Sequence, residues 1–228
     1  TLCELTNSSL EGKKVLDFGC GWAQTLKYFK SKGADCYGCD PAIEAVTYGK
    51  QQGLNVVLTQ MDTLRVFNDI KFDVVLLLNV LEHVADPVKT IAEIKRDILK
   101  KDGILVVEVP NDYNVFQECA TQVHQLRKWW IAPPAHLNYF NKDTLLSLLE
   151  GQGFSPELTT GSFPLEMFLL FGDNYVGNPA LGRACHERRV AFEMNLKKYG
   201  YNKQLQDFYK ALAQVNLGRQ ILTYARAS

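Results

Sequence analysis

The stretch Val15-Leu16-Asp17-Phe18-Gly19-Cys20-Gly21 decides the fold. Its pattern predicts a buried strand that ends in an acid, then a glycine-rich turn and an amphipathic helix over about 22–32. The two glycines allow the backbone to turn sharply and to approach a ligand closely. A dinucleotide-binding turn has a third glycine three residues after the second, and Gln24 stands at that position here. The carboxylate of Asp17 would also repel a pyrophosphate and attract a cation, so the sequence argues against a phosphate-binding turn.

Two more acidic positions follow the next two predicted strands. The strand at 35–38 runs out into Asp40, and an acid about twenty residues beyond the glycines commonly binds a ribose diol. The strand at 55–59 is followed by Met61 and Asp62. The carboxyl ends of parallel strands meet at one edge of a sheet, so we expect these acids to line one crevice. Such a set suits S-adenosylmethionine, which carries an ammonium, a sulfonium, a ribose and an adenine amino group.

Strands and helices alternate along the first half of the chain, which predicts an α/β fold with a doubly wound, mostly parallel sheet. The run Val74-Val75-Leu76-Leu77-Leu78 is typical of a strand covered on both faces. The expected strands are 15–18, 35–38, 55–59, 72–78 and 104–109, and the expected helices between them are 22–32, 43–52 and 88–99.

Three stretches carry a family resemblance. The opening stretch resembles the first motif of class I S-adenosylmethionine-dependent methyltransferases. The region from Phe72-Asp73-Val74-Val75 to Leu81-Glu82-His83-Val84-Ala85-Asp86-Pro87 is similar to the fourth-strand region of the small-molecule branch of that family. Leu99-Lys100-Lys101-Asp102-Gly103-Ile104-Leu105 resembles its turn into strand five. The resemblance covers roughly 13–160 and implies a Rossmann-like methyltransferase.

The resemblance also implies a cofactor site for S-adenosyl-L-methionine. The first turn would hold the methionine portion, the acid after the second strand the ribose, and the pair after the third strand the adenine. The residue just after the fourth strand would approach the methionine end. The cofactor-site residues are Asp17, Gly19, Cys20, Gly21, Asp40, Pro41, Met61, Asp62, Asn79 and Val80.

The acceptor site is expected in the long segment 111–138, which interrupts the regular alternation after the fifth strand. Its aromatic side chains suit a sugar, a phenol or another planar or amphipathic small molecule. The candidate substrate residues are Asp112, Tyr113, Trp129, Trp130 and Tyr139. An oxygen acceptor needs a base, so His136 is our first candidate and His83 the second. A structural role for either histidine is the alternative.

A helical segment at 162–214 separates a sixth strand, 154–160, from a strand signal at 218–225. We expect the latter to be an antiparallel seventh strand beside the sixth. The chain at 1–228 would then be a single methyltransferase domain with a seven-stranded sheet. The helical insertion is a candidate lid or homodimer surface.

The composition limits the classes of binding partner that we expect for the chain. Lys and Arg number 25 and Asp and Glu number 25, so net charge favours neither nucleic acid nor an anionic membrane. We find no apolar run as long as a membrane span and no secretory leader, which predicts a cytoplasmic protein. The chain begins at Thr1 rather than Met, which leaves the removal of an upstream segment open. Cys36 and Cys39 lie three apart on a strand and point to opposite faces, so we expect reduced thiols and no metal site.

The sequence therefore predicts a methyltransferase that acts on a small molecule, at a hydroxyl oxygen of a sugar or glycan, a phenol or another metabolite. One alternative is a nicotinamide-dependent oxidoreductase, which would share the fold. Another is a noncatalytic cofactor-binding or scaffold protein. Methyltransferases that act on base amino groups of nucleic acid typically have, after strand four, an Asn or Asp followed by two prolines and an aromatic residue. Here Val80-Leu81-Glu82 follows Asn79, which argues against that branch.

Overall fold

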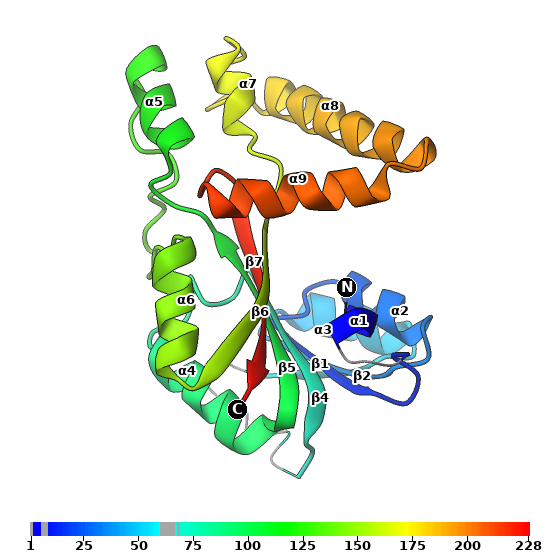
Figure 1. Cartoon of the computed structure of the whole chain (residues 1–228). Coiled ribbons are helices and arrows are strands. Elements are labelled where there is room, and N and C mark those ends of the chain that lie inside the picture. Colours follow the sequence, from blue (N-terminus) through cyan, green and yellow to red (C-terminus); the bar gives the residue numbers. More distant parts are fainter. Residues whose placement is uncertain (1, 6–8, 60–66, 68) are drawn as a thin grey trace. The chain divides into compact units, whose positions relative to one another are not determined.

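A computed structural model of the chain describes residues 2–5, 9–59, 67 and 69–228 (Figure 1). The chain forms two compact units. The first unit comprises Thr1–Glu108, Leu146–Leu158 and Thr223–Ser228. The second unit comprises Val109–Leu145 and Thr159–Leu222. Both segments that the sequence singles out, 111–138 and 162–214, therefore fall in the second unit.

Seven strands form one sheet in the order β3-β2-β1-β4-β5-β7-β6. The strands β1 to β5 pair in parallel. Main-chain hydrogen bonds join Ser162 to Gln220 at one end of β6 and Ser228 to Gly153 at the other, so β7 runs antiparallel to β6. The predicted doubly wound, mostly parallel seven-stranded sheet with an antiparallel last strand is confirmed. The strands are β1 (Lys14–Phe18), β2 (Asp35–Asp40), β3 (Asn55–Leu58), β4 (Phe72–Leu78), β5 (Leu99–Pro110), β6 (Phe154–Gly161) and β7 (Gln220–Ala227).

Helices cover both faces of the sheet in the first unit. In Figure 1, α2 and α3 lie on one side, and α4 and the first-unit part of α6 lie on the other. Leu26 of α2 and Ile91 of α4 are fully buried, as are Val74, Val75 and Leu77 of β4. Burial on both faces explains the continuous apolar run of β4. The helical elements are α1 (Leu2–Leu5), α2 (Gln24–Lys30), α3 (Ile43–Gln51), α4 (Pro87–Glu93), the π-helical turn η2 (Ile94–Ile98) and α6 (Lys142–Gly151).

The region between β4 and β5 differs from the sequence prediction. The helix expected at 88–99 ends as α4 at Glu93 and continues as η2, while β5 begins at Leu99 instead of Ile104. Leu99 pairs with Phe72, and the ladder then shifts register before Ile104 pairs with Val74. Pairing with β4 thus extends the strand through a polar stretch that has no strand pattern of its own.

The second unit is mainly helical. Its helix α5 (Val115–His124) starts with a capping box in which Asn114 and Gln117 each bond to the other's main-chain amide. The helices α8 (Pro179–Lys198) and α9 (Asn202–Gln214) contact each other, and α7 (Glu166–Leu170) contacts α5. The predicted helical character of 162–214 agrees with these elements. The single-domain and homodimer predictions stay predictions.

We find no helix among the described residues that combines the length and apolarity needed to cross a bilayer.

Candidate functional site

The turn after β1 is shaped by backbone conformations that favour glycine. Gly19 has φ 80° and Gly21 has φ 47°, both in the left-handed region. The amides of Gly19 and Cys20 both donate to Cys39 O on β2, at 2.8 and 3.0 Å. A Cβ added to Gly21 would have no heavy atom within 4 Å. The turn therefore leaves open space beside a fixed backbone.

Asp40 at the end of β2 connects this turn to the second strand. Its Oδ2 accepts a hydrogen bond of 2.8 Å from the Gly21 amide, and its Oδ1 accepts one of 2.8 Å from the Ala42 amide. Only 8 % of Asp40 is exposed. A carboxylate oxygen accepts more than one hydrogen bond, so both oxygens keep the capacity to bind ribose hydroxyls.

Asp17 at the end of β1 is a buried acid next to the same turn. It is 2 % exposed, and its Oδ1 accepts no hydrogen bond from the described residues. Burial, and then the nearby charge of Asp40, raise the pKa of Asp17 to about 7. A ligand that brings a positive charge or an N–H donor would supply what this carboxyl lacks, so the residues present fit S-adenosylmethionine.

The remaining predicted cofactor residues fall around this turn and after β4. Cys20 is buried, and burial raises the pKa of its thiol to about 12, which makes it a packing residue and not a nucleophile. Pro41 is exposed, whereas Val80 is buried. Met61 and Asp62, the expected adenine contacts, lie outside the described residues.

Two acids that the sequence prediction missed lie near Asn79. Asn79, with φ 57°, donates through Nδ2 to Glu108 Oε1 at 2.9 Å, and its amide donates to Glu108 O at 2.9 Å. Glu82 is 2 % exposed, and among the described residues its Oε2 has no hydrogen-bond partner. Burial raises the pKa of Glu82 and of Glu108. An acid inside the apolar run Val106-Val107-Glu108-Val109 was the signal that could have identified Glu108.

His83 lies beside Glu82 in the first unit. Its Nε2 is 3.8 Å from Glu82 Oε1, and its side chain is 40 % exposed. The imidazole is therefore open to solvent on one side and next to a buried carboxyl on the other. A carboxyl that accepts from an imidazole N–H can orient the ring for proton transfer.

The predicted acceptor residues form an aromatic cluster within the second unit. The ring of Tyr113 lies 5.9 Å from Trp130 and 6.3 Å from Tyr139, and Trp129 lies 4.9 Å from Trp130, all edge to face. Trp130 is buried, and no described residue accepts a hydrogen bond from its Nε1. Lys128 places Nζ 5.0 Å from the Tyr113 ring centroid. Tyr113 itself is 47 % exposed, so the cluster is partly open to solvent at this residue.

His136 belongs to the same cluster. Its ring centroid is 6.3 Å from that of Tyr139. The Tyr139 hydroxyl accepts from the Ala132 amide at 3.2 Å and donates to His136 O at 3.4 Å, which fixes the loop backbone around the histidine. Asp112 is 2 % exposed, and its amide donates to Phe140 O at 2.7 Å. The structure thus places the predicted acceptor residues together in the second unit, and the described residues of the predicted cofactor site, with His83, in the first.

Comparisons with known proteins agree with this architecture. A family model described as a methyltransferase domain matches residues 2–158. A ubiquinone biosynthesis O-methyltransferase of Haemophilus ducreyi is 36% identical over 114 residues, which cover 46% of this chain and 48% of the relative. A protein of the same name from Cereibacter sphaeroides is 29% identical over 154 residues, 64% of this chain and 62% of the relative. The first of these matches spans about half the length of the relative.

Solved structures share the fold. A SAM-dependent methyltransferase from Archaeoglobus fulgidus superposes with a TM-score of 0.62 at 18% identity, over 99% of this chain and 90% of that one. Magnesium protoporphyrin IX methyltransferase from Synechocystis PCC 6803, solved with bound SAH, gives 0.59 at 14% identity, over 98% and 78%. The family model matches more than half of the chain, so the chain belongs to the methyltransferase-domain family. The predicted membership of the class I S-adenosylmethionine-dependent methyltransferases is confirmed.

Proposed function

We propose that the protein transfers a methyl group from S-adenosylmethionine to a hydroxyl oxygen of a small molecule. The observation that carries this proposal is the pair of buried acids, Asp17 and Asp40, at the ends of neighbouring strands beside an open glycine turn. The methyltransferase-domain match supports methyl transfer over hydride transfer by a nicotinamide cofactor.

The described residues divide the binding of the methyl donor between them. Asp40 would accept hydrogen bonds from the ribose hydroxyls, and Asp17 would offset the positive charge of the methionine portion. Gly19 and Gly21 leave the backbone bare where the ligand passes. When bound, S-adenosylmethionine supplies an activated methyl group on a sulfonium. The protein's main task is then to align an acceptor lone pair and to exclude water.

The acceptor is a small hydroxylated molecule with a planar or amphipathic body. The half-exposed Tyr113 and the rings around it would stack on a sugar or an aromatic ring. His136 would take the hydroxyl proton as the oxygen attacks the methyl carbon, with His83 as the second candidate for this base. Relatives named as O-methyltransferases of ubiquinone biosynthesis support oxygen as the accepting atom and a phenol as the first acceptor to test.

A radiolabelled-methyl assay tests this function. The protein would be incubated with methyl-labelled S-adenosylmethionine and a panel of phenols and sugars, each paired with a control in which the hydroxyl is already methylated. We expect label transfer to at least one free hydroxyl and none to its blocked partner. A protein that binds the donor but labels no acceptor, including those in cell extracts, would support the noncatalytic alternative.

A further inference from the structure

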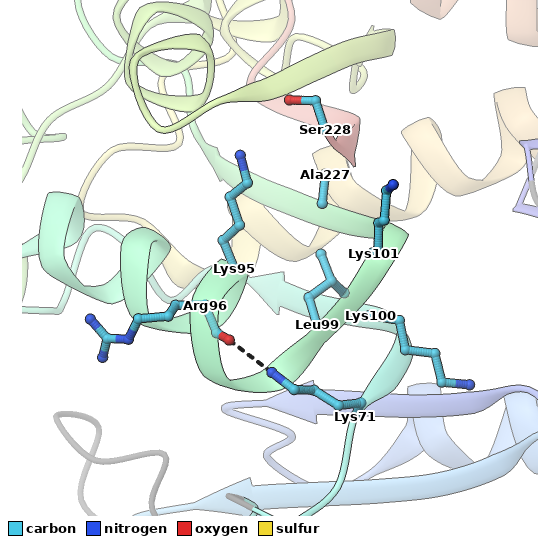
Figure 2. A pocket seen from close by; sticks show the side chains of 8 residues that line it. All are labelled: Lys71, Lys95, Arg96, Leu99, Lys100, Lys101, Ala227 and Ser228. Carbon is cyan, nitrogen blue, oxygen red and sulfur yellow. Dashed lines mark hydrogen bonds between the residues drawn. The ribbon is translucent and has the colours of Figure 1, made fainter.

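A pocket of about 450 Å³ opens in the first unit where β4 and β5 begin. The lining residues labelled in Figure 2 include cations from the segment before β4, from η2 and from β5. No acidic side chain lines it in the part of the chain that the structure describes. The pocket lies at the amino ends of β4 and β5, whereas the glycine turn follows the carboxyl end of β1, which is parallel to β4. At the usual rise of a strand, the two ends of the sheet are about 20 Å apart. The lining cations are Lys71, Lys95, Arg96, Lys100 and Lys101.

Two of these cations, Lys71 and Lys95, donate hydrogen bonds to main-chain oxygens. Lys71 donates through Nζ to the main-chain oxygen of Arg96 at 2.8 Å, as the dashed line in Figure 2 shows. Lys95 donates to the main-chain oxygens of Gln152 and Gly153 at 3.2 and 2.6 Å. Carbonyl oxygens orient an ammonium group but do not cancel its charge, and each ammonium has three donors.

Two of the five cations have ion-pair partners outside the pocket lining. Lys100 pairs with Asp73 at 2.8 Å, and Arg96 pairs with Asp97. Arg96 and Asp97 are exposed enough for solvent to screen their interaction. The pocket therefore holds more positive than negative charge even after both pairs are counted.

A second pocket of about 200 Å³ lies next to the first and shares Lys100 and Lys101 with it. It adds Lys13 and Arg226 as further cations, together with the acids Asp73 and Asp102. Seven of the chain's 25 Lys and Arg side chains line the two pockets, in a protein whose net charge is zero. Arg226 pairs with Glu157 and Arg96 pairs with Asp97, so three cations remain in excess once Asp73, Asp97, Asp102 and Glu157 are all counted. Such a local excess creates a positive potential that the overall composition conceals.

We infer that this pair of pockets, the basic pocket, binds a phosphate group. A phosphate combines about two negative charges with several acceptor oxygens, which suits a pocket lined by Lys and Arg donors better than a carboxylate or a neutral ligand does. The phosphate can come from a free polyphosphate compound or from the headgroup of an anionic lipid. Both sources present the same chemistry to the lysines.

The test uses the full chain and two matched variants. Lys71→Gln/Lys101→Gln removes two charges from the basic pocket but keeps side chains that can donate hydrogen bonds. Lys32→Gln/Lys50→Gln removes two charges from exposed positions of the same unit that line neither pocket. S-adenosylmethionine binding of both variants should match the parent, because none of these lysines belongs to the glycine turn, and thermal unfolding checks that both variants are folded.

The probes are inorganic tripolyphosphate, measured by calorimetry, and phosphatidylcholine vesicles with or without phosphatidic acid, measured by flotation. We expect the parent and the control variant to bind at least one probe, and the pocket variant to bind it about tenfold or more weakly. Binding of tripolyphosphate alone assigns a free phosphate compound, and binding of phosphatidic acid vesicles assigns a lipid headgroup. Equal losses in both variants, or a parent that binds neither probe, would overturn the inference.

Discussion

The main-chain amide of Gly21 donates a hydrogen bond of 2.8 Å to Asp40 Oδ2, and this bond joins the first glycine turn to the end of the second strand. The carboxylate thereby fixes the turn, and it faces the same space as the turn. Asp40 accepts a second hydrogen bond from the main-chain amide of Ala42. The position of its carboxylate is therefore fixed by two main-chain donors. The main-chain frame of the proposed donor site is therefore formed by the fold itself.

Removal of the Asp40 carboxylate should weaken binding of S-adenosylmethionine. Hydrogen bonds to a charged group contribute about 1.5–3 kcal/mol, so Asp40→Ala should raise the dissociation constant by about 10- to 100-fold. Asp35→Ala is the control, because Asp35 is an exposed acid at the other end of the same strand. Calorimetry that gives the same affinity for Asp40→Ala and Asp35→Ala would remove Asp40 from the site.

The pKa of Asp17 should make donor affinity depend on pH. Its value of about 7 means that the carboxyl is partly protonated near neutrality, and a cationic ligand favours the charged form. As pH rises toward 7, the affinity for the donor should therefore increase by up to about tenfold per pH unit, and above pH 7 it should level off. In Asp17→Asn this rise should be absent, and calorimetry between pH 5.5 and about 8.5 would measure both profiles.

The same pKa predicts the sign of a stability change. Because the folded-state pKa of Asp17 lies above its unfolded value of 3.8, the folded protein holds the proton more tightly. The contribution of this group to the free energy of unfolding should fall as pH rises from about 4 to about 7. Asp17→Asn should therefore gain thermal stability relative to the parent across this range. A constant difference in melting temperature would contradict the raised pKa.

Comparison of Gly21→Ala with a control variant should distinguish backbone strain from loss of donor binding. Alanine at φ 47° costs about 1–2 kcal/mol, although its Cβ meets no heavy atom within 4 Å. Gly12→Ala is a matched control, because Gly12 has φ 69° and equally open surroundings. Denaturant unfolding should show similar destabilisation of both variants, whereas only Gly21→Ala should lose donor affinity. Equal affinities would mean that the space beside Gly21 is not a ligand site.

His136 and His83 can be distinguished by pH-rate profiles. General-base catalysis contributes about 10²- to 10⁴-fold, so replacement of the base by Asn should lower kcat by that range and remove the acidic limb of the profile. We expect this for His136→Asn and a smaller, pH-independent effect for His83→Asn. The opposite pattern would make His83 the base, and turnover of both variants within a few-fold of the parent would exclude an imidazole base.

Much of the sheet could be predicted from the sequence because its strands are buried on both faces. The predicted bounds of β4, 72–78, match the structure, and β3 differs by one residue. The start of β5 could not be predicted, since Lys100 and Lys101 carry no strand pattern and are ordered by pairing of the neighbouring Leu99 with β4. Within the segment 111–138, α5 ends at His124, and Gln125 after it adopts a left-handed conformation, φ 52°.

The candidate site was less accessible to sequence reasoning than the fold. The motif identified Asp17 and Asp40 because their positions relative to the glycines are fixed by the strand ends. Glu108 was missed because its bond to Asn79 joins residues 29 apart in sequence. The basic pocket was missed because its cations come from separate segments, and only their convergence in space creates the charge excess.

Equilibrium binding of two ligands to the same protein tests the central claim most directly. Calorimetry would compare S-adenosylmethionine with NADH at pH 8, where Asp17 is charged. The account predicts that S-adenosylmethionine binds and that NADH, whose diphosphate would meet the two carboxylates, binds at least about tenfold more weakly. NADH binding as tightly as S-adenosylmethionine would contradict it.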